Sequence, residues 1–136
     1  MDQVRAAVIG CGAFARHQHL PNIVRSDKLH LVAGCSRSEE NRRFVEEHFS
    51  PEWTTADAED IFAADDIDLV VLSVPHDTHL EMVLRTVAAG KHVLCEKPMT
   101  MTMDESYQVV KAVKRAGVKL CVDYNRRFAP SMRHLK

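Results

Sequence analysis

Five short, mostly apolar runs recur along the chain. They span residues 4–9, 29–35, 67–74, 92–95 and 118–124, and they are rich in β-branched and other apolar residues. Runs of this length without strict alternation are typical of strands buried on both faces of a parallel sheet. The pattern therefore predicts five parallel strands, and a short edge strand is expected near Trp53.

Helical periodicity fills the segments between these runs. Residues 79–89 carry one apolar helix face with the spacing i, i+3, i+4, i+7 and i+8, formed by Leu80, Val83, Leu84, Val87 and Ala88. Gly90 supplies a C-terminal stop for this helix. A capping box at residues 102–105 begins another helix, which is expected to end at Gly117. Its predicted inner face consists of Val109, Val110, Val113 and Ala116.

Three more segments are predicted to be helical. Ser38 is placed to cap a helix that runs to Phe49 and covers three side chains: Phe44, Val45 and His48. Residues 58–63 are expected to form at least one helical turn. The helix after the first strand contains Pro21, which lacks an N–H group, so a kink or break is expected near residues 17–21.

Strands and helices thus alternate along most of the chain. The simplest packing of this order is a parallel sheet with helices on both faces and right-handed crossovers. We therefore predict an α/β protein with a doubly wound parallel sheet, that is, a three-layer α/β/α Rossmann fold, in residues 1–124. Residues 125–136 start a new element, and the chain stops just as that element begins.

Composition limits the class of partner. The 136 residues are 46% hydrophobic and 27% charged, which suits one globular domain with its own core. The 18 basic and 19 acidic residues give a net charge of -1, so nothing attracts the chain to nucleic acid or an anionic membrane. The first residues lack the apolar region of a signal peptide, and no apolar run reaches about 18 residues. A cytoplasmic location without a membrane or nucleic-acid partner is predicted.

The loop after the first strand carries the clearest motif. Residues 10–15 read GxGxxA, directly between a strand and a helix. In a dinucleotide site Gly10 permits the tight turn, Gly12 lets the pyrophosphate approach the backbone, and Ala15 keeps the helix close to the sheet. The phosphates then lie at the helix N-terminus, beside Ala13 and Phe14. An ordinary tight strand-to-helix turn is the alternative interpretation.

The end of the second strand bears on the choice of cofactor. An acidic residue there would bind the ribose 2′-hydroxyl of NAD, but the strand continues with Ser36 and Arg37. A hydroxyl followed by a guanidinium suits a 2′-phosphate, so NADP(H) is favoured. The alternative is that these serines cap the helix, Arg37 is solvated, and Glu39 or Glu40 serves NAD(H).

These features together resemble a known family. GxGxxA after the first strand, then SVP at residues 73–75, His79, AGKHVLCEKP at residues 89–98 and YNRRFAP at residues 124–130 follow one another as in the N-terminal half of the Gfo/Idh/MocA oxidoreductases. That family includes glucose-fructose oxidoreductase and inositol dehydrogenase. The resemblance covers nearly the whole chain, and residues 89–98 are its most specific part.

The resemblance implies roles for particular residues. The lysine of the family's Glu-Lys-Pro signature falls on Lys97, which would lie beside the nicotinamide and the substrate hydroxyl and act in catalysis. Glu96 would orient Lys97 or contact the nicotinamide ribose, and Pro98 would fix the turn through a cis bond. The remaining cofactor contacts implied are Ser73, Val74, Pro75, His76, His79 and Arg127, although Arg126 and Arg127 also read as a solvated basic pair.

A metal site is not predicted. His76 and His79 have HxxH spacing, but two histidines without a clustered carboxylate or thiolate make a poor zinc set. The four cysteines, Cys11, Cys35, Cys95 and Cys121, show no CxxC spacing and are expected to be buried free thiols.

The resemblance also implies that residues 125–136 begin a second domain, which is missing from this chain. Family members continue into a second α+β domain that carries the substrate pocket, a general base and the oligomer interface. The parent protein is thus expected to be an NAD(P)-dependent oxidoreductase of a sugar, cyclitol or related small molecule, a homo-oligomer when complete, and this chain alone is expected to be inactive. A stand-alone pyridine-nucleotide sensor is the alternative, and a methyltransferase using S-adenosylmethionine is a third interpretation that leaves Lys97 without a task.

Overall fold

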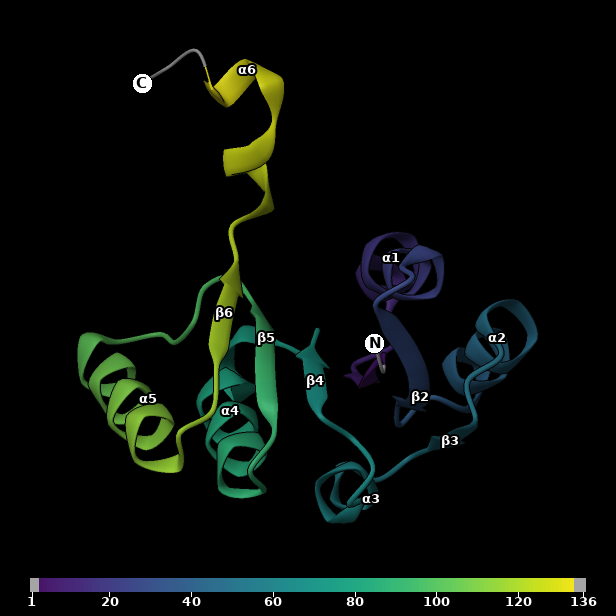
Figure 1. Cartoon of the computed structure of the whole chain (residues 1–136), viewed down its shortest axis with the longest axis horizontal. Coiled ribbons are helices and arrows are strands. Elements are labelled where there is room, and N and C mark those ends of the chain that lie inside the picture. Colours follow the sequence, from purple (N-terminus) through teal and green to yellow (C-terminus); the bar gives the residue numbers. More distant parts are fainter. Residues whose placement is uncertain (1–2, 134–136) are drawn as a thin grey trace.

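Six parallel strands form one sheet in the computed structural model, which describes residues 3–133 (Figure 1). The strands are β1 (Val4–Ile9), β2 (Leu29–Cys35), β3 (Trp53–Thr55), β4 (Leu69–Leu72), β5 (His92–Glu96) and β6 (Leu120–Asp123). Their spatial order is β3-β2-β1-β4-β5-β6, and every neighbouring pair is parallel. The predicted doubly wound α/β fold is confirmed, and the strand order reverses between β1 and β4, where such sheets bind ligands.

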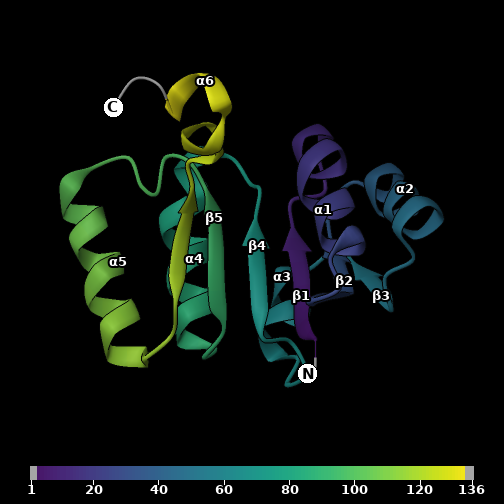
Figure 2. The same cartoon turned by 45° about the horizontal axis from the view of Figure 1, so that its top comes forward.

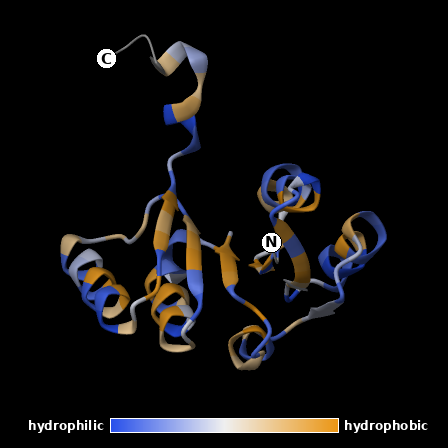
Figure 3. Ribbon diagram, viewed as in Figure 1, coloured by the Kyte–Doolittle hydropathy of each residue, from blue (hydrophilic) through white to orange (hydrophobic). Residues whose placement is uncertain are grey.

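Helices cover both faces of the sheet. One face packs against α1 (Leu20–Arg25) and α2 (Glu39–Phe49), and the other against α3 (Ala58–Ala63), α4 (His79–Ala88) and α5 (Met103–Ala116) (Figure 2). Side chains alternate along β1 between the two faces of the sheet, so the core forms two separate layers. Ala6 and Val8 belong to the core on the α1 face, whereas Ala7 and Ile9 belong to the core on the α4 face. Apolar residues accordingly concentrate on the strands and on the inward sides of the helices (Figure 3).

Some predicted helix faces are wrong in detail. Val109 of α5 is buried, but Val110 is 42% exposed and Ala116 is also exposed. α5 covers the sheet near its β6 edge, so only a narrow stripe of its surface meets the core. His48 of α2 is exposed as well, and its ring stacks on Phe44 with centroids 4.0 Å apart.

The irregularity expected near residues 17–21 is present as an interruption of the regular α-helix. Residues 15–19 form a π-helical turn that leads directly into α1, and the N–H of Leu20 donates to the carbonyl of Ala15. Pro21 occupies the start of α1, where its missing N–H group costs least. The turn carries one extra residue, and this buries the side chain of His19.

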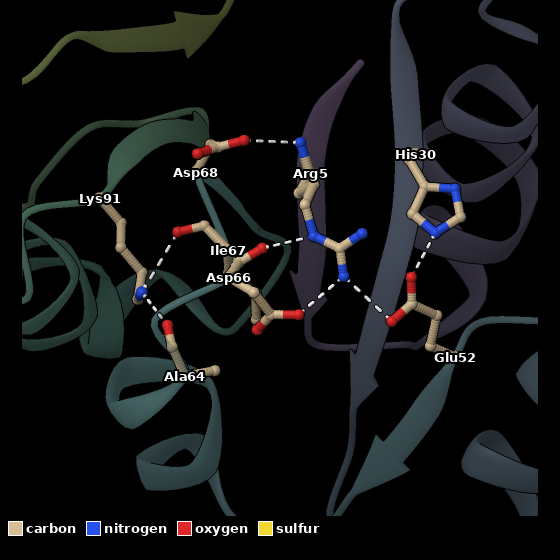
Figure 4. Close-up of polar contacts among 8 residues, drawn as sticks. All are labelled: Arg5, His30, Glu52, Ala64, Asp66, Ile67, Asp68 and Lys91. Atoms are coloured by element: carbon tan, nitrogen blue, oxygen red, sulfur yellow. Dashed lines mark hydrogen bonds and ion pairs between the residues drawn. The ribbon is translucent and has the colours of Figure 1, made fainter. Parts of the chain in front are cut away.

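A polar network closes the amino end of the sheet, opposite the glycine loop (Figure 4). Arg5 of β1 pairs with Asp66 at 2.7 Å and with Glu52 at 3.0 Å, and its backbone N–H donates to Asp68 at 2.9 Å. His30 lies 2.6 Å from the other oxygen of Glu52. Buried Lys91 donates to the carbonyls of Ala64 and Ile67. The Arg5 contacts tie two strand-connecting loops to β1, and Lys91 ties the loop before β5 to the loop before β4.

The described chain ends beyond β6 with a 3-10 turn, Asn125–Phe128, and α6 (Pro130–Arg133), which extend away from the layers (Figure 1). Residues 1–2 of the predicted first domain and 134–136 of the predicted second one lie outside the described part, and the boundary at residue 124 stays a prediction. Within residues 3–133, every helix is too short or too polar to span a lipid bilayer.

Candidate functional site

The carboxyl ends of β1 and β4 meet at Gly10. Its φ is +94°, and a Cβ at this position would lie 2.6 Å from the carbonyl carbon of Ser73. The N–H of Ser73 donates to Ile9, and the N–H of Gly10 donates to Cys35 at the same distance of 2.9 Å. Only glycine adopts this conformation in the available space, so the tight turn expected of Gly10 is present.

The next glycine faces open space. A Cβ at Gly12 would meet no atom within 4 Å, and Gly12 lines a cavity of about 620 Å³. Ala13 and Phe14 are exposed beside it, whereas Ala15 is buried against the sheet. A ligand can therefore approach the Gly12 backbone closely, which is the access that a pyrophosphate requires. The loop fits a dinucleotide on this observation.

Polar side chains from the end of β2 line the same cavity: Ser36, Arg37, Ser38 and Asn41. Arg42 holds their loop by donating to the carbonyls of Ser36 at 2.7 Å and Arg37 at 3.1 Å. The Ser38 side chain caps α2, as predicted, by accepting from the Asn41 N–H. Arg37 contributes a positive charge to the opening. Asp57 also lines the cavity, but its carboxylate accepts from the Glu59 N–H and caps α3.

A second cavity, of about 450 Å³, lies toward β5 and β6. It is lined by Phe14, Ser73, Val74, His76, Glu96, Lys97, Asp123, Asn125 and Arg126. Ser73 and Val74 line both cavities, so the two meet at the carboxyl end of β4. Pro75 lines only the first cavity. Lys97 is exposed, and among residues 3–133 its ammonium group has no hydrogen-bond or ion-pair partner.

The turn at residues 96–98 is held from the α4 face by His79. The Lys97–Pro98 peptide bond is cis, as the resemblance implied. His79 is fully buried, with Nδ1 at 2.6 Å from the Pro98 carbonyl oxygen and Nε2 at 3.1 Å from the Val74 carbonyl oxygen. A neutral imidazole carries one N–H group, so His79 donates to one of these two carbonyls while its ring lies between them.

His19 reaches the same turn from the α1 face. Its Nε2 lies 2.8 Å from Oε1 of Glu96, and both side chains are largely buried. His19, Glu96 and Asp123 bring their ring nitrogen and carboxylate oxygens within 4.8 Å of one another. Periodicity and motif spacing did not single out His19 or Asp123, because their proximity depends on the π-helical turn and on the pairing of β5 with β6.

Two other predictions concern cysteines and arginines. Cys11, Cys35 and Cys95 are buried free thiols, but Cys121 is exposed on β6, so the expectation that all four are buried is wrong for that residue. Burial raises the pKa of Cys11 and Cys95 to about 12 and that of Cys35 to about 11. Arg126 lines the second cavity, whereas the Arg127 guanidinium lies 6.0 Å from the Phe128 ring centroid.

Known proteins are similar to this chain in sequence and in fold. Oxidoreductase P35 of Formosa agariphila is 35% identical over 95% of this chain and 40% of its own length. D-apiose dehydrogenase of Paraburkholderia graminis is 32% identical over 97% of this chain and 35% of its own length. The crystal structure of KijD10, a 3-ketoreductase from Actinomadura kijaniata, in complex with TDP-benzene and NADP, matches 98% of this chain and 42% of its own with a TM-score of 0.92 and 26% identity.

The family assignment follows from a model that covers most of the chain. The chain spans about two fifths of the length of P35, so the relatives are much longer than these 136 residues. A family model described as an oxidoreductase family with an NAD-binding Rossmann fold matches residues 4–124. The chain therefore belongs to the Gfo/Idh/MocA oxidoreductase family, of which it carries the NAD-binding Rossmann domain.

Proposed function

We propose that this chain binds NADP(H) for an oxidoreductase that transfers a hydride between the nicotinamide and a hydroxyl or carbonyl group of a sugar, cyclitol or related small molecule. The observation that carries this proposal is the pair of cavities that meet at Ser73 and Val74. One has the open glycine backbone for a pyrophosphate and the Ser36–Arg37 end for an adenosine 2′-phosphate. The other contains Lys97 and would take the nicotinamide half, so the two cavities correspond to the two halves of a dinucleotide.

The preference for NADP(H) rests on Arg37. A guanidinium beside two serine hydroxyls is suited to a phosphate dianion, and the β2 end carries no carboxylate that would repel it. Asp57 is the carboxylate in the lining of that cavity, and it is engaged in capping α3. NAD(H) is the alternative cofactor, in which case Glu39 or Glu40 would bind the ribose hydroxyls.

Lys97 is the proposed catalytic residue. Its ammonium group would donate a hydrogen bond to the substrate oxygen, stabilise the developing alkoxide and pass on a proton. The nicotinamide supplies the hydride acceptor or donor. Glu96 and the cis-Pro98 turn set the position of Lys97, and His79 fixes that turn to the loop beside the nicotinamide half. The general base and the substrate pocket belong to the remainder of the protein.

We further propose that the complete protein is a cytoplasmic homo-oligomer whose substrate resembles the sugar-like molecules named for its relatives. D-apiose dehydrogenase is such a relative. Gel filtration of the complete protein tests the oligomer. Turnover tests with a sugar and cyclitol panel test the substrate class, with Lys97→Met expected to lose turnover and to keep cofactor binding.

Calorimetric titration of this chain tests the cofactor. We expect NADPH to bind more tightly than NADH, and S-adenosylmethionine not to bind. Gly12→Ala is the informative variant, because its methyl group enters open space and leaves the fold unstrained but occupies the place of the pyrophosphate. We expect it to weaken NADPH binding about tenfold or more, which corresponds to about 1.4 kcal/mol, at an unchanged melting temperature. Binding of S-adenosylmethionine alone would overturn the proposal.

A further inference from the structure

A buried histidine on each face of the sheet contacts the turn that carries Lys97. His79 holds the Pro98 carbonyl from the α4 side. His19 holds the Glu96 carboxylate from the α1 side, at 2.8 Å, with 7% of the His19 and 12% of the Glu96 side chain exposed. Desolvating both members of such a pair is costly, so a pair at the rim of a ligand cavity calls for a reason beyond stability.

The π-helical turn is what brings His19 to Glu96. Residues 15–19 carry an extra residue per turn, and His19 is the last of them and is buried. The Phe14 ring lies edge-on to His19, with centroids 5.4 Å apart, and lines the cavity that contains Lys97. π-helical turns of this kind are frequent at functional sites. The His19 side chain therefore contacts both Phe14 of the glycine loop and Glu96 of the turn that carries Lys97.

The remaining contacts of Glu96 show which way its carboxylate is directed. Oε1 accepts from His19, and Oε2 accepts from the Lys97 backbone N–H at 3.3 Å. Asp123 is the register partner of Glu96 on β6, so both carboxylates lie on the α1 side of the sheet and repel one another. Without His19 the Glu96 carboxylate would lose its buried partner and keep the repulsion.

We infer that His19 is a positioning residue that holds Glu96 as the hydrogen-bond acceptor for the hydroxyls of the nicotinamide-side ribose. This inference rests on the proposed binding of a pyridine dinucleotide. Glu96 lines the cavity assigned to that half, and a fixed carboxylate can accept from two neighbouring hydroxyls. His19 does not itself line the cavity, so it acts through its neighbours, and Glu96 is the one to which it is hydrogen-bonded.

Three ligands of increasing length separate positioning from simple stabilisation. Adenosine 2′,5′-bisphosphate ends before the second ribose, 2′-phospho-ADP-ribose includes it, and NADP⁺ adds the nicotinamide. We expect His19→Ala to weaken 2′-phospho-ADP-ribose and NADP⁺ by about the same factor, roughly tenfold for one charge-assisted hydrogen bond, and to leave the bisphosphate unchanged. If NADH is the tighter ligand, then AMP, ADP-ribose and NAD⁺ replace this series.

Two further variants complete the experiment. His19→Gln keeps an N–H donor near the position of Nε2 and is expected to restore most of the affinity. His17→Ala removes an exposed histidine from the same π-helical turn and is expected to bind all three ligands like the unmodified chain. Thermal unfolding of each variant shows that the protein under titration is folded.

Each other outcome overturns the inference. Equal weakening of all three ligands by His19→Ala would indicate a merely structural role, and no weakening would indicate no role. Weakening of NADP⁺ alone would assign Glu96 to the nicotinamide rather than the ribose. Failure of His19→Gln to recover affinity would exclude the N–H donor as the cause. If the unmodified chain binds none of the ligands, the proposed function itself has failed, which is a distinguishable result.

Discussion

His79 Nδ1 lies 2.6 Å from the Pro98 carbonyl oxygen, in a side chain that is fully buried. Its other nitrogen faces the Val74 carbonyl oxygen, so one imidazole joins the two loops that line the cavity of Lys97. We predict that His79→Leu lowers the free energy of unfolding by about 2 kcal/mol, because the single N–H of a neutral imidazole is lost and one buried carbonyl is left without its donor at about 1–3 kcal/mol. Urea unfolding followed by Trp53 fluorescence measures this, and exposed His17→Leu, within about 0.5 kcal/mol, is the control.

Alanine is predicted to destabilise the folded chain at Gly10 but not at Gly12. Gly10→Ala combines a φ of +94° with a Cβ 2.6 Å from the Ser73 carbonyl carbon, so we expect a loss of about 3 kcal/mol or more of unfolding free energy. Gly12→Ala meets no atom within 4 Å and should change stability by less than about 0.5 kcal/mol. Equal stabilities in the same urea experiment would contradict the geometry of the turn.

The Arg5 network predicts a loss of stability in acid. The hydrogen bond from Arg5, supported by His30, lowers the pKa of Glu52, and the hydrogen bond from Arg5 lowers the pKa of Asp66. A carboxyl whose pKa is lower in the folded chain stabilises it above the unfolded pKa, and this contribution disappears as the pH falls through the folded pKa.

The corresponding test compares Glu52→Gln with the unmodified chain at several pH values. We expect the variant to be less stable at about pH 7 and the difference to shrink as the pH falls below the unfolded pKa of glutamate and through the lower folded pKa of Glu52. Exposed Glu40→Gln should show no such convergence. A stability difference independent of pH would show that the Glu52 charge is not what matters.

Arg37 is predicted to set the choice of cofactor. Arg37→Gln should weaken NADPH about tenfold through the loss of a charge-assisted contact and should leave NADH within about twofold. The NADPH affinity of the unmodified chain should also fall more steeply with salt. Arg43→Gln, which breaks only an exposed pair with Glu39, is the matched control. Equal effects of Arg37→Gln on both cofactors would contradict the 2′-phosphate assignment.

Thiol labelling reports on the packing of the core. Cys121 is exposed, whereas burial raises the pKa of Cys11 and Cys95 to about 12 and leaves them almost without thiolate near neutral pH. We expect a thiol-specific reagent to label Cys121 rapidly in the folded chain and the other three cysteines only after unfolding. The Cys121→Ser variant should lose the rapid phase, and fast labelling that survives in it would show that the core is open.

The fold was predictable because it depends on local patterns. Apolar runs separated by helical periodicity required a parallel sheet, and the capping box that begins α5 is present as predicted. The face of each helix was less predictable. Val109 and Val110 are adjacent and equally apolar, but they point about 100° apart around the helix axis, and the packing of α5 buries the first and exposes the second.

The residues of the candidate site were likewise only partly predictable from the sequence. The glycine loop and the Glu-Lys-Pro turn are contiguous in sequence, so motif reading found them. Asp123 reaches Glu96 only through the register of β5 and β6, and His19 only through the π-helical turn. Pro21, two residues after His19, was the available sequence signal, since it predicted an irregular helix at that point. It did not predict which side chain that irregularity would bury.

The central claim is that a pyridine dinucleotide spans the two cavities, with its pyrophosphate at Gly12 and its nicotinamide beside Lys97. A crystal structure of the chain with NADP⁺ measures this most directly. We predict the pyrophosphate within hydrogen-bonding distance of the backbone N–H groups that follow Gly12, and the Lys97 ammonium group directed toward the nicotinamide. A structure with the nucleotide elsewhere, or with Lys97 pointing away from the nicotinamide ring, would contradict the account.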